Sequence, residues 1–135
     1  MNTFTLSVLA AEKPFYEDEC LSLVIPTNGG QYGIQAMHNN ITAAIVPGML
    51  KITTPSGEEI IAAVSEGLVK IENNRVLLLV DTVELPEEID ENRAKNSAAQ
   101  AKEAILQKKS IQDYYAAQAK MARAISRLRV KKYGK

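Results

Sequence analysis

The amino-acid sequence predicts an α+β chain, with an N-terminal antiparallel β-sandwich of eight to ten short strands and a C-terminal antiparallel two-helix hairpin. Three observations support this prediction. Turn-forming residues recur about every eight residues in the first part of the chain, and segments of alternating apolar and polar residues lie between them. Both patterns stop near Pro86, where an alanine-rich stretch of strong helix formers begins. The formal charge also changes sign there.

The strands of residues 1–86 are predicted from a period of two. Phe4, Leu6 and Val8 alternate with polar residues, which is typical of a strand with one buried face. A parallel sheet would require crossover helices, for which this segment has no room, so we expect antiparallel strands. Further strand-like segments are residues 21–25, 41–46, 50–53, 59–64, 68–71 and 76–80.

Residues 87–135 are predicted to form two helices, at about 87–107 and 111–131. Acidic residues at the start of the first helix complement its dipole. Ser110 is expected to begin the second helix, with Asp113 as an acidic variant of the capping box. One apolar stripe is expected along the second helix, made of Tyr114, Ala117, Met121, Ala124 and Leu128, with Ile111 and Ile125 beside it. Because an alanine seam buries little apolar area, we expect a weakly anchored hairpin that stays helical while its docking changes.

Composition excludes several classes of protein. The chain of 135 residues is short enough for one domain, or for a small domain with an appendage. Its single cysteine, Cys20, and single histidine, His38, exclude a disulfide framework and a zinc cluster. Its longest apolar runs have five residues, whereas a membrane-spanning helix needs about 20. We therefore expect an intracellular, soluble protein without a metal site.

The overall charge of zero hides two oppositely charged parts. Residues 1–86 carry 4 basic and 10 acidic residues, a net charge of −6, and residues 87–135 carry 12 basic and 6 acidic residues, a net charge of +6. The basic hairpin suits a solubilising face, a patch that binds nucleic acid, or a face that docks on an acidic protein.

Four stretches, in this order, resemble the epsilon subunit of bacterial and chloroplast F-type ATP synthase over the whole chain. They are residues 4–8 with 20–27, residues 30–48, residues 80–94 and residues 119–130. The third contains Ile89, Asp90, Arg93 and Ala94, in the pattern [IL]-D-x-x-R-A of that family. The sequence departs from the family around His38, which is usually preceded by Pro-Gly and followed by a proline.

The resemblance implies a non-catalytic rotor subunit of the central stalk, which couples ion-driven rotation to ATP synthesis and inhibits ATP hydrolysis through mobile C-terminal helices. Residues 1–86 would bind the gamma subunit and the c-ring, and the regulatory hairpin of residues 87–135 would either fold on the sandwich or extend toward the catalytic alpha and beta subunits. The expected location is the cytoplasmic face of the bacterial plasma membrane. The absence of a G-x-x-x-x-G-K-[ST] loop agrees with a non-catalytic role.

No cofactor is required, but the resemblance implies ATP as an allosteric ligand. By this resemblance, the residues expected to bind ATP are Glu84, Ile89, Asp90, Arg93, Ala94, Arg123 and Arg127. Those carried over for partner interfaces are Gln31, His38, Arg129 and Lys131. Alternatively, Asp90 and Arg93 only cap the first helix. Gln100 stands where ATP-binding members have a basic residue, which favours weaker phosphate binding.

The alternative function is a small nucleic-acid-binding protein that uses the basic hairpin. The acidic first part of the chain and the scarcity of aromatic residues for base stacking count against it. We therefore expect no nucleic-acid partner.

Overall fold

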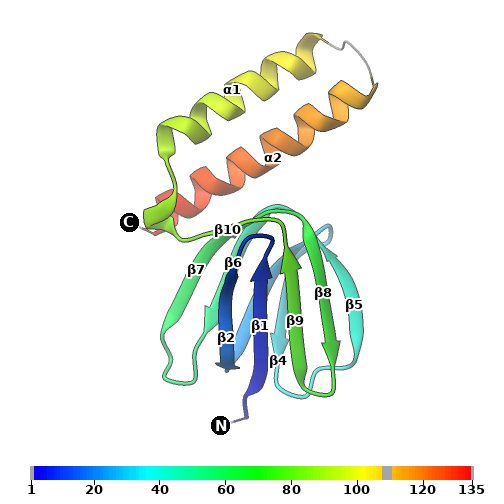
Figure 1. Ribbon diagram of the computed structural model, residues 1–135, viewed down its shortest axis with the longest axis vertical. Coiled ribbons are helices and arrows are strands. Elements are labelled where there is room, and N and C mark those ends of the chain that lie inside the picture. Colours follow the sequence, from blue (N-terminus) through cyan, green and yellow to red (C-terminus); the bar gives the residue numbers. More distant parts are fainter. Residues whose placement is uncertain (1, 108–110, 135) are drawn as a thin grey trace.

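The computed structural model describes residues 2–107 and 111–134. In this part of the chain, ten strands form two packed five-stranded sheets, so the predicted sandwich is confirmed (Figure 1). The first sheet has the order β2 (Pro14–Cys20), β1 (Phe4–Ala10), β9 (Arg75–Val80), β8 (Gly67–Glu72) and β5 (Ile41–Ile45). The second has the order β10 (Val83–Glu84), β7 (Glu59–Val64), β6 (Gly48–Thr53), β3 (Ser22–Thr27) and β4 (Gly30–Gln35).

Among the described strands, every paired neighbour is antiparallel except β1 and β9, which are parallel. The register places Leu6 opposite Val76. No crossover helix is needed, because the chain passes through the rest of the sandwich between these two strands. The predicted period of two is seen directly in β1, where Phe4, Leu6 and Val8 are buried in the core between the sheets.

Two α-helices follow the sandwich, as predicted. They are α1 (Glu91–Gln107) and α2 (Ile111–Tyr133), preceded by the 3-10 turn η1 (Pro86–Glu88). The first α-helix begins at Glu91 rather than at the predicted residue 87, because Ile89 has an extended backbone that separates it from the turn. Ser110, the expected start of the second helix, lies outside the described residues.

The second helix has two buried faces where the sequence pattern predicted one. Ala117 and Ala124 are buried on the α1 side, and the buried Ala94 and Ala101 of α1 complete the predicted alanine seam. A further face, with Ser126 and Val130, is also buried. Ile125 was expected beside the apolar stripe but is 36 % exposed, because the sandwich contacts the neighbouring position, Ser126, instead.

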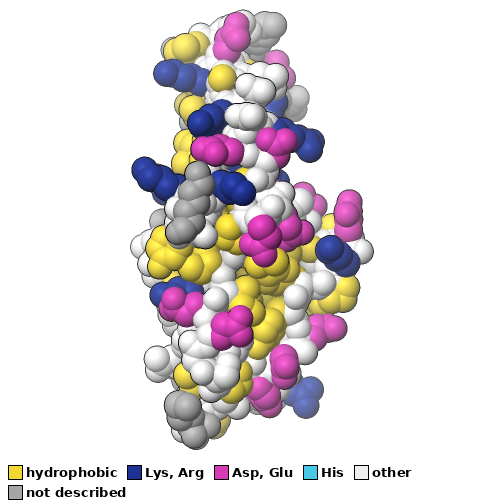
Figure 2. Space-filling model, turned by 90° about the vertical axis from the view of Figure 1, so that its left-hand side faces the viewer, with side chains coloured by type: hydrophobic (Ala, Val, Ile, Leu, Met, Phe, Trp, Pro, Cys, Tyr) yellow, Lys and Arg dark blue, Asp and Glu magenta, His cyan; other side chains and the backbone are white. Residues whose placement is uncertain are grey.

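The surface reflects the division of charge. Viewed from the side of β2 and β7, the sandwich shows mainly acidic side chains around a hydrophobic area, whereas most Lys and Arg side chains lie on the hairpin (Figure 2). Within the described residues, neither helix is long and apolar enough to cross a membrane. The same part of the chain holds no group of three His, Cys, Asp or Glu side chains placed to bind a metal ion.

Candidate functional site: the contact between hairpin and sandwich

The C-terminal half of α2 lies against the second sheet, and α1 lies on the outer side of α2, away from the sandwich (Figure 1). The apolar part of this contact is small. Val130 of α2 packs with Ile89 of the junction and Ala63 of β7, and the half-buried Met49 and Ile61 surround them. The hairpin is therefore held by one short stretch of one helix.

Polar contacts border this apolar cluster. Ser126 donates a hydrogen bond from Oγ to the carbonyl oxygen of Gly48, at 2.9 Å. Lys131 donates from Nζ to the carbonyl oxygen of Pro86, at 3.0 Å. Ser126 and Val130 lie about one turn apart, so they share the helix face that meets the sandwich, and Lys131 borders this face.

Two ion pairs join the same face of α2 to the sandwich. Arg123 Nη1 lies 3.0 Å from Glu66 Oε1, in the turn between β7 and β8. Arg127 Nε donates to Glu84 Oε1, on β10. Of the carried-over ATP-binding residues, the structure thus brings Glu84 and Arg127 into contact, and Arg123 lies one helical turn away.

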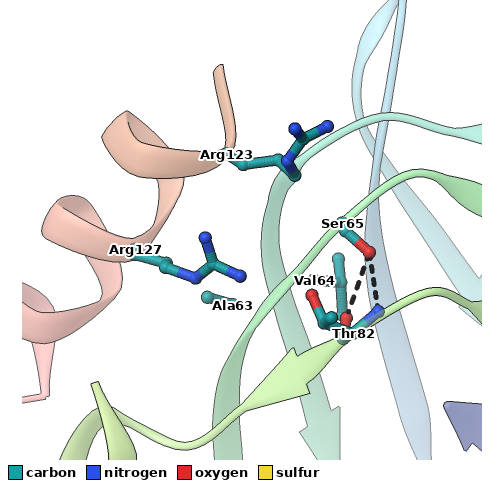
Figure 3. Close-up of a pocket in the computed structure, with 6 residues that line it drawn as sticks. All are labelled: Ala63, Val64, Ser65, Thr82, Arg123 and Arg127. Atoms are coloured by element: carbon teal, nitrogen blue, oxygen red, sulfur yellow. Dashed lines mark hydrogen bonds between the residues drawn. The ribbon is translucent and has the colours of Figure 1, made fainter. Parts of the chain in front are cut away.

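A shallow pocket lies between the two arginines (Figure 3). Ala63, Val64, Ser65 and Thr82 form its sandwich wall. The backbone N–H of Thr82 donates to Ser65 Oγ at 2.7 Å, so the polar groups of this wall already bond one another. The pocket leaves essentially no space for even a water-sized molecule, whereas small-molecule sites usually have volumes of about 300–1,000 Å³. While both arginines contact carboxylates, it is too small for a nucleotide.

The remaining ATP-binding candidates lie at the start of α1. Asp90 Oδ1 accepts a hydrogen bond from the backbone N–H of Arg93 at 3.0 Å, which is the contact of an N-cap residue. Ile89 and Ala94 are buried, and the Arg93 side chain is exposed. The capping role of Asp90 is therefore present.

One hydrogen bond shows how the two helices are aligned along their lengths. Lys120 donates it from Nζ to Gln100 Oε1, at 2.9 Å. In antiparallel helices, this register brings Arg93 to the level of Arg127. Gln100, at which the resemblance implied weaker phosphate binding, thus accepts a hydrogen bond from a lysine of the same chain.

The predicted partner-interface residues form two separate groups. Gln31 is exposed on β4, and His38 lies in the following loop, where its Nε2 is 2.7 Å from the Tyr32 hydroxyl. Arg129 and Lys131 lie on α2, where Arg129 is exposed and Lys131 contacts Pro86. The structure does not bring these two groups together.

Sequence reasoning missed Glu66, Gly48 and Ser126. Ser126 carried a weak signal, since a small polar residue lies one turn from the apolar Val130. Glu66 and Gly48 lie in turns, where their residue types are common, so only the folded chain shows that they contact α2.

This fold and contact define a class of subunit: a β-sandwich that carries a C-terminal helical hairpin, docked through its last helix. The beta-sandwich domain of the ATP synthase delta/epsilon chain matches residues 3–86. The long alpha-helix domain of the same family matches residues 87–132. The chain belongs to the ATP synthase delta/epsilon chain family.

Individual relatives agree with this assignment. The ATP synthase epsilon chain of Ruminiclostridium cellulolyticum is 38 % identical over 128 residues, which cover 95 % of each chain. That of Clostridium novyi is 35 % identical over 126 residues, covering 93 % of this chain and 95 % of the relative. The predicted family and the predicted function as an epsilon subunit of an ATP synthase are confirmed, and the chain is therefore part of a membrane-associated complex.

Solved structures show the same fold. A chain of the Euglena gracilis mitochondrial ATP synthase, OSCP/F1/c-ring, superposes with a TM-score of 0.82 at 16 % identity, covering 93 % of this chain and 79 % of that one. A chain of the Tetrahymena thermophila mitochondrial ATP synthase, central stalk/c-ring, gives 0.62 at 16 % identity, covering 94 % and 95 %.

Proposed function

We propose that this chain is a non-catalytic rotor subunit that couples ion-driven rotation to ATP synthesis and restrains ATP hydrolysis through its hairpin. Its partners are the gamma subunit and the c-ring on the side of the sandwich, and the alpha and beta subunits on the side of the hairpin. Its place is the cytoplasmic face of the bacterial plasma membrane. The observation that supports regulation best is the narrow contact of α2, because such a contact can open without unfolding either part.

In the docked hairpin, part of the basic face is occupied by the chain itself. Arg123 and Arg127 contact carboxylates, and Lys131 contacts a carbonyl oxygen. Undocking frees these cations, which join the exposed Arg129 in facing an acidic surface of the catalytic subunits. Each such contact is partly exposed and is worth about 0.2–1 kcal/mol, so the inhibition weakens as salt rises.

The test uses the assembled complex in native membranes. Deleting residues 110–135 is expected to raise ATP hydrolysis while the complex stays assembled. Arg129→Gln is expected to raise hydrolysis in part, because Arg129 is exposed and its loss leaves docking intact. Lys95→Gln on α1 removes the same charge elsewhere and serves as the control. Unchanged hydrolysis after the deletion would rule out the regulatory role and leave coupling as the only role of the chain.

We further propose that ATP binds the isolated chain as an effector, at Arg93, Arg123 and Arg127 with Asp90 beside them. Guanidinium groups bind phosphate oxygens in a bidentate manner, and a carboxylate can accept from the adenine amino group. Binding requires Arg123 and Arg127 to leave Glu66 and Glu84, which enlarges the pocket. Gln100 removes one phosphate contact and weakens the affinity.

Isothermal titration of the isolated chain with ATP tests this site. Arg93→Gln is the sharpest variant, because among the described residues no side-chain partner holds the Arg93 guanidinium, so the fold is retained. A loss of affinity of tenfold or more is expected. Asp90→Asn keeps the helix cap and separates capping from binding. No heat up to millimolar ATP, or equal binding by Arg93→Gln, contradicts the site.

A further inference from the structure

Asn28 and Gly29 form the two-residue turn between β3 and β4, where the register pairs Thr27 with Gly30. Both turn residues are exposed to solvent. The turn is closed by Thr27, whose Oγ1 donates a hydrogen bond to the Gly30 carbonyl oxygen at 2.7 Å. Among the described residues, no hydrogen bond holds the Asn28 side chain. Its amide is therefore free to approach the backbone that follows it.

The glycine after Asn28 is not required by the shape of the turn. The left-handed conformation belongs to Gly30, with a φ of 109°, and not to Gly29. A Cβ added at Gly29 would come within 4 Å of Thr27 Oγ1 alone, at 3.9 Å, which is an ordinary van der Waals contact. The effect of Gly29 is instead to leave its backbone nitrogen unshielded, because glycine has no side chain. No other asparagine of the sequence precedes a glycine.

Other asparagines are held in ways that Asn28 is not. The Asn74 side chain accepts from the Met37 backbone N–H at 2.7 Å and donates to the Thr3 carbonyl oxygen at 3.0 Å. The backbone N–H that follows Asn92 donates to Asp90 Oδ1 at 3.0 Å. In the first case the side-chain amide is fixed, and in the second the backbone nitrogen beside it is engaged.

We infer that Asn28 is a site of spontaneous deamidation in the folded chain. Solvent hydroxide removes the Gly29 N–H proton, and the backbone nitrogen attacks Asn28 Cγ. The N–Cγ bond forms, the Cγ–Nδ2 bond breaks, and the departing nitrogen takes a proton from water and leaves as ammonia. Water then opens the resulting five-membered succinimide at either carbonyl, which gives aspartate or isoaspartate at position 28. Each product carries one additional negative charge.

The two products differ in their effect on the sheet. Aspartate leaves the main chain unchanged, whereas isoaspartate adds one methylene group to it. A two-residue turn cannot absorb this length while Thr27 stays paired with Gly30. Because β4 is an edge strand that pairs with β3 alone, the start of β4 loses its pairing. The change therefore reaches Gln31, the next residue of β4.

Peptide mapping by mass spectrometry tests the site on the free, full-length chain during incubation at mildly alkaline pH. Deamidation at Asn28 is expected to be roughly tenfold faster than at Asn74 or Asn92, because only its neighbouring nitrogen is unshielded. The rate rises with pH, since the attack requires removal of the N–H proton. Because the free chain is used, the result does not bear on the proposed function.

Gly29→Ala is the sharpest variant, because its methyl group shields the backbone nitrogen and fits the turn. Deamidation is expected to slow by roughly tenfold, with thermal unfolding unchanged. Gly33→Ala is the matched control, since a Cβ there would meet nothing within 4 Å. The control is expected to deamidate like the unmodified chain. Equal rates in Gly29→Ala and the unmodified chain would overturn the inference.

Unfolding the chain in denaturant gives a second comparison. Asn74 and Asn92 are expected to deamidate faster there, because the hydrogen bonds that protect them are lost. Asn28 is expected to change little, since the folded turn already leaves it free. If Asn28 stayed intact in the folded chain and reacted only in denaturant, the turn would be protective and the inference would be wrong.

Amide hydrogen exchange along β4 tests the effect of isoaspartate. The isoaspartate form, separated by chromatography after incubation, is expected to exchange faster along β4 than the unmodified chain. Asn28→Asp adds the same charge without lengthening the main chain, so its exchange is expected to match that of the unmodified chain. Equal exchange in all three forms would overturn the predicted loss of pairing.

Discussion

Ser126 of α2 bonds to Gly48 of β6 across the contact between hairpin and sandwich. Its Oγ donates to the Gly48 carbonyl oxygen at 2.9 Å, and the Ser126 side chain is buried. Gly48 lies so close to β3 that an added Cβ would stand 2.4 Å from Pro26 Cβ. This residue pair fixes α2 at one position along the second sheet.

Ser126→Ala is expected to weaken docking of the hairpin by about 1 kcal/mol, because it removes a buried hydrogen bond and leaves the Gly48 carbonyl oxygen without its donor. Amide hydrogen exchange along α2 measures this as an increase of about fivefold. Ala122→Ser, on an exposed position of the same helix, controls for the change in side chain. Equal exchange in the Ser126→Ala variant and the unmodified chain would show that the bond does not hold the helix.

The Arg127–Glu84 ion pair is expected to couple more strongly than the Lys70–Glu72 pair. The first has side chains 29 % and 28 % exposed, and the second 59 % and 54 %. Double-mutant cycles with glutamine, measured by denaturant unfolding, should give a coupling free energy of about 1 kcal/mol for the first pair and nearly zero for the second. The first value should fall in 1 M salt. A larger coupling for Lys70–Glu72 would contradict the role of partial burial.

Gly67→Ala and Gly33→Ala are expected to differ in stability, although both change a strand glycine. A Cβ at Gly67 would stand 2.0 Å from the Leu79 carbonyl oxygen, whereas a Cβ at Gly33 would meet nothing within 4 Å. The first variant should lose about 1–3 kcal/mol of unfolding free energy or more, and the second should be close to neutral. Thermal unfolding of the two variants decides this, and equal losses would contradict it.

The Cys20 thiol is expected to resist alkylation in the folded chain. Burial raises its pKa from the ordinary value of 9.0 to about 11. At pH 8 the thiolate fraction is then about a hundredfold lower than in the unfolded chain. Iodoacetamide should therefore label Cys20 in urea and leave the native chain unlabelled over the same time. Rapid labelling of the native chain would contradict its burial.

The same shift predicts how stability changes with pH. Because the folded pKa is above the unfolded one, the unfolded chain loses its proton first as pH rises. The contribution of the Cys20 thiol to the free energy of unfolding is therefore complete below about pH 9 and is lost between about pH 9 and 11. Comparing denaturant unfolding of the unmodified chain and Cys20→Ala across this range isolates the effect, since the variant lacks the thiol.

Much of the fold could be predicted from the sequence, because local patterns determine it. The alternation of Phe4, Leu6 and Val8 predicts a strand, and the alanine seam predicts a helical hairpin. The parallel pairing of β1 with β9 could not be predicted in this way. This pairing depends on how strands distant in sequence arrange to bury their apolar faces. The alternation of residues within one strand does not indicate which other strand lies beside it.

The candidate site was predictable only in part. The resemblance supplied Glu84, Arg123 and Arg127, but not Glu66, whose carboxylate holds Arg123. A single glutamate in a turn looks like any solvated charge until the fold places a helix beside it. For the same reason, the stripe on α2 predicted the face toward α1 and missed the face toward the sandwich, where polar contacts of Ser126 and Lys131 replace apolar periodicity.

The parallel pairing of β1 and β9 has a consequence for synthesis on the ribosome. The first strand leaves the ribosome early, but its place between β2 and β9 is complete only after Val80 has emerged. Until then β1 and β2 form a two-stranded ribbon with both edges unpaired, and such ribbons are marginally stable alone. Closure over a long sequence separation is slow compared with helix formation. The nascent sandwich therefore closes late, and the hairpin, made last, reaches a docking surface that has only just formed.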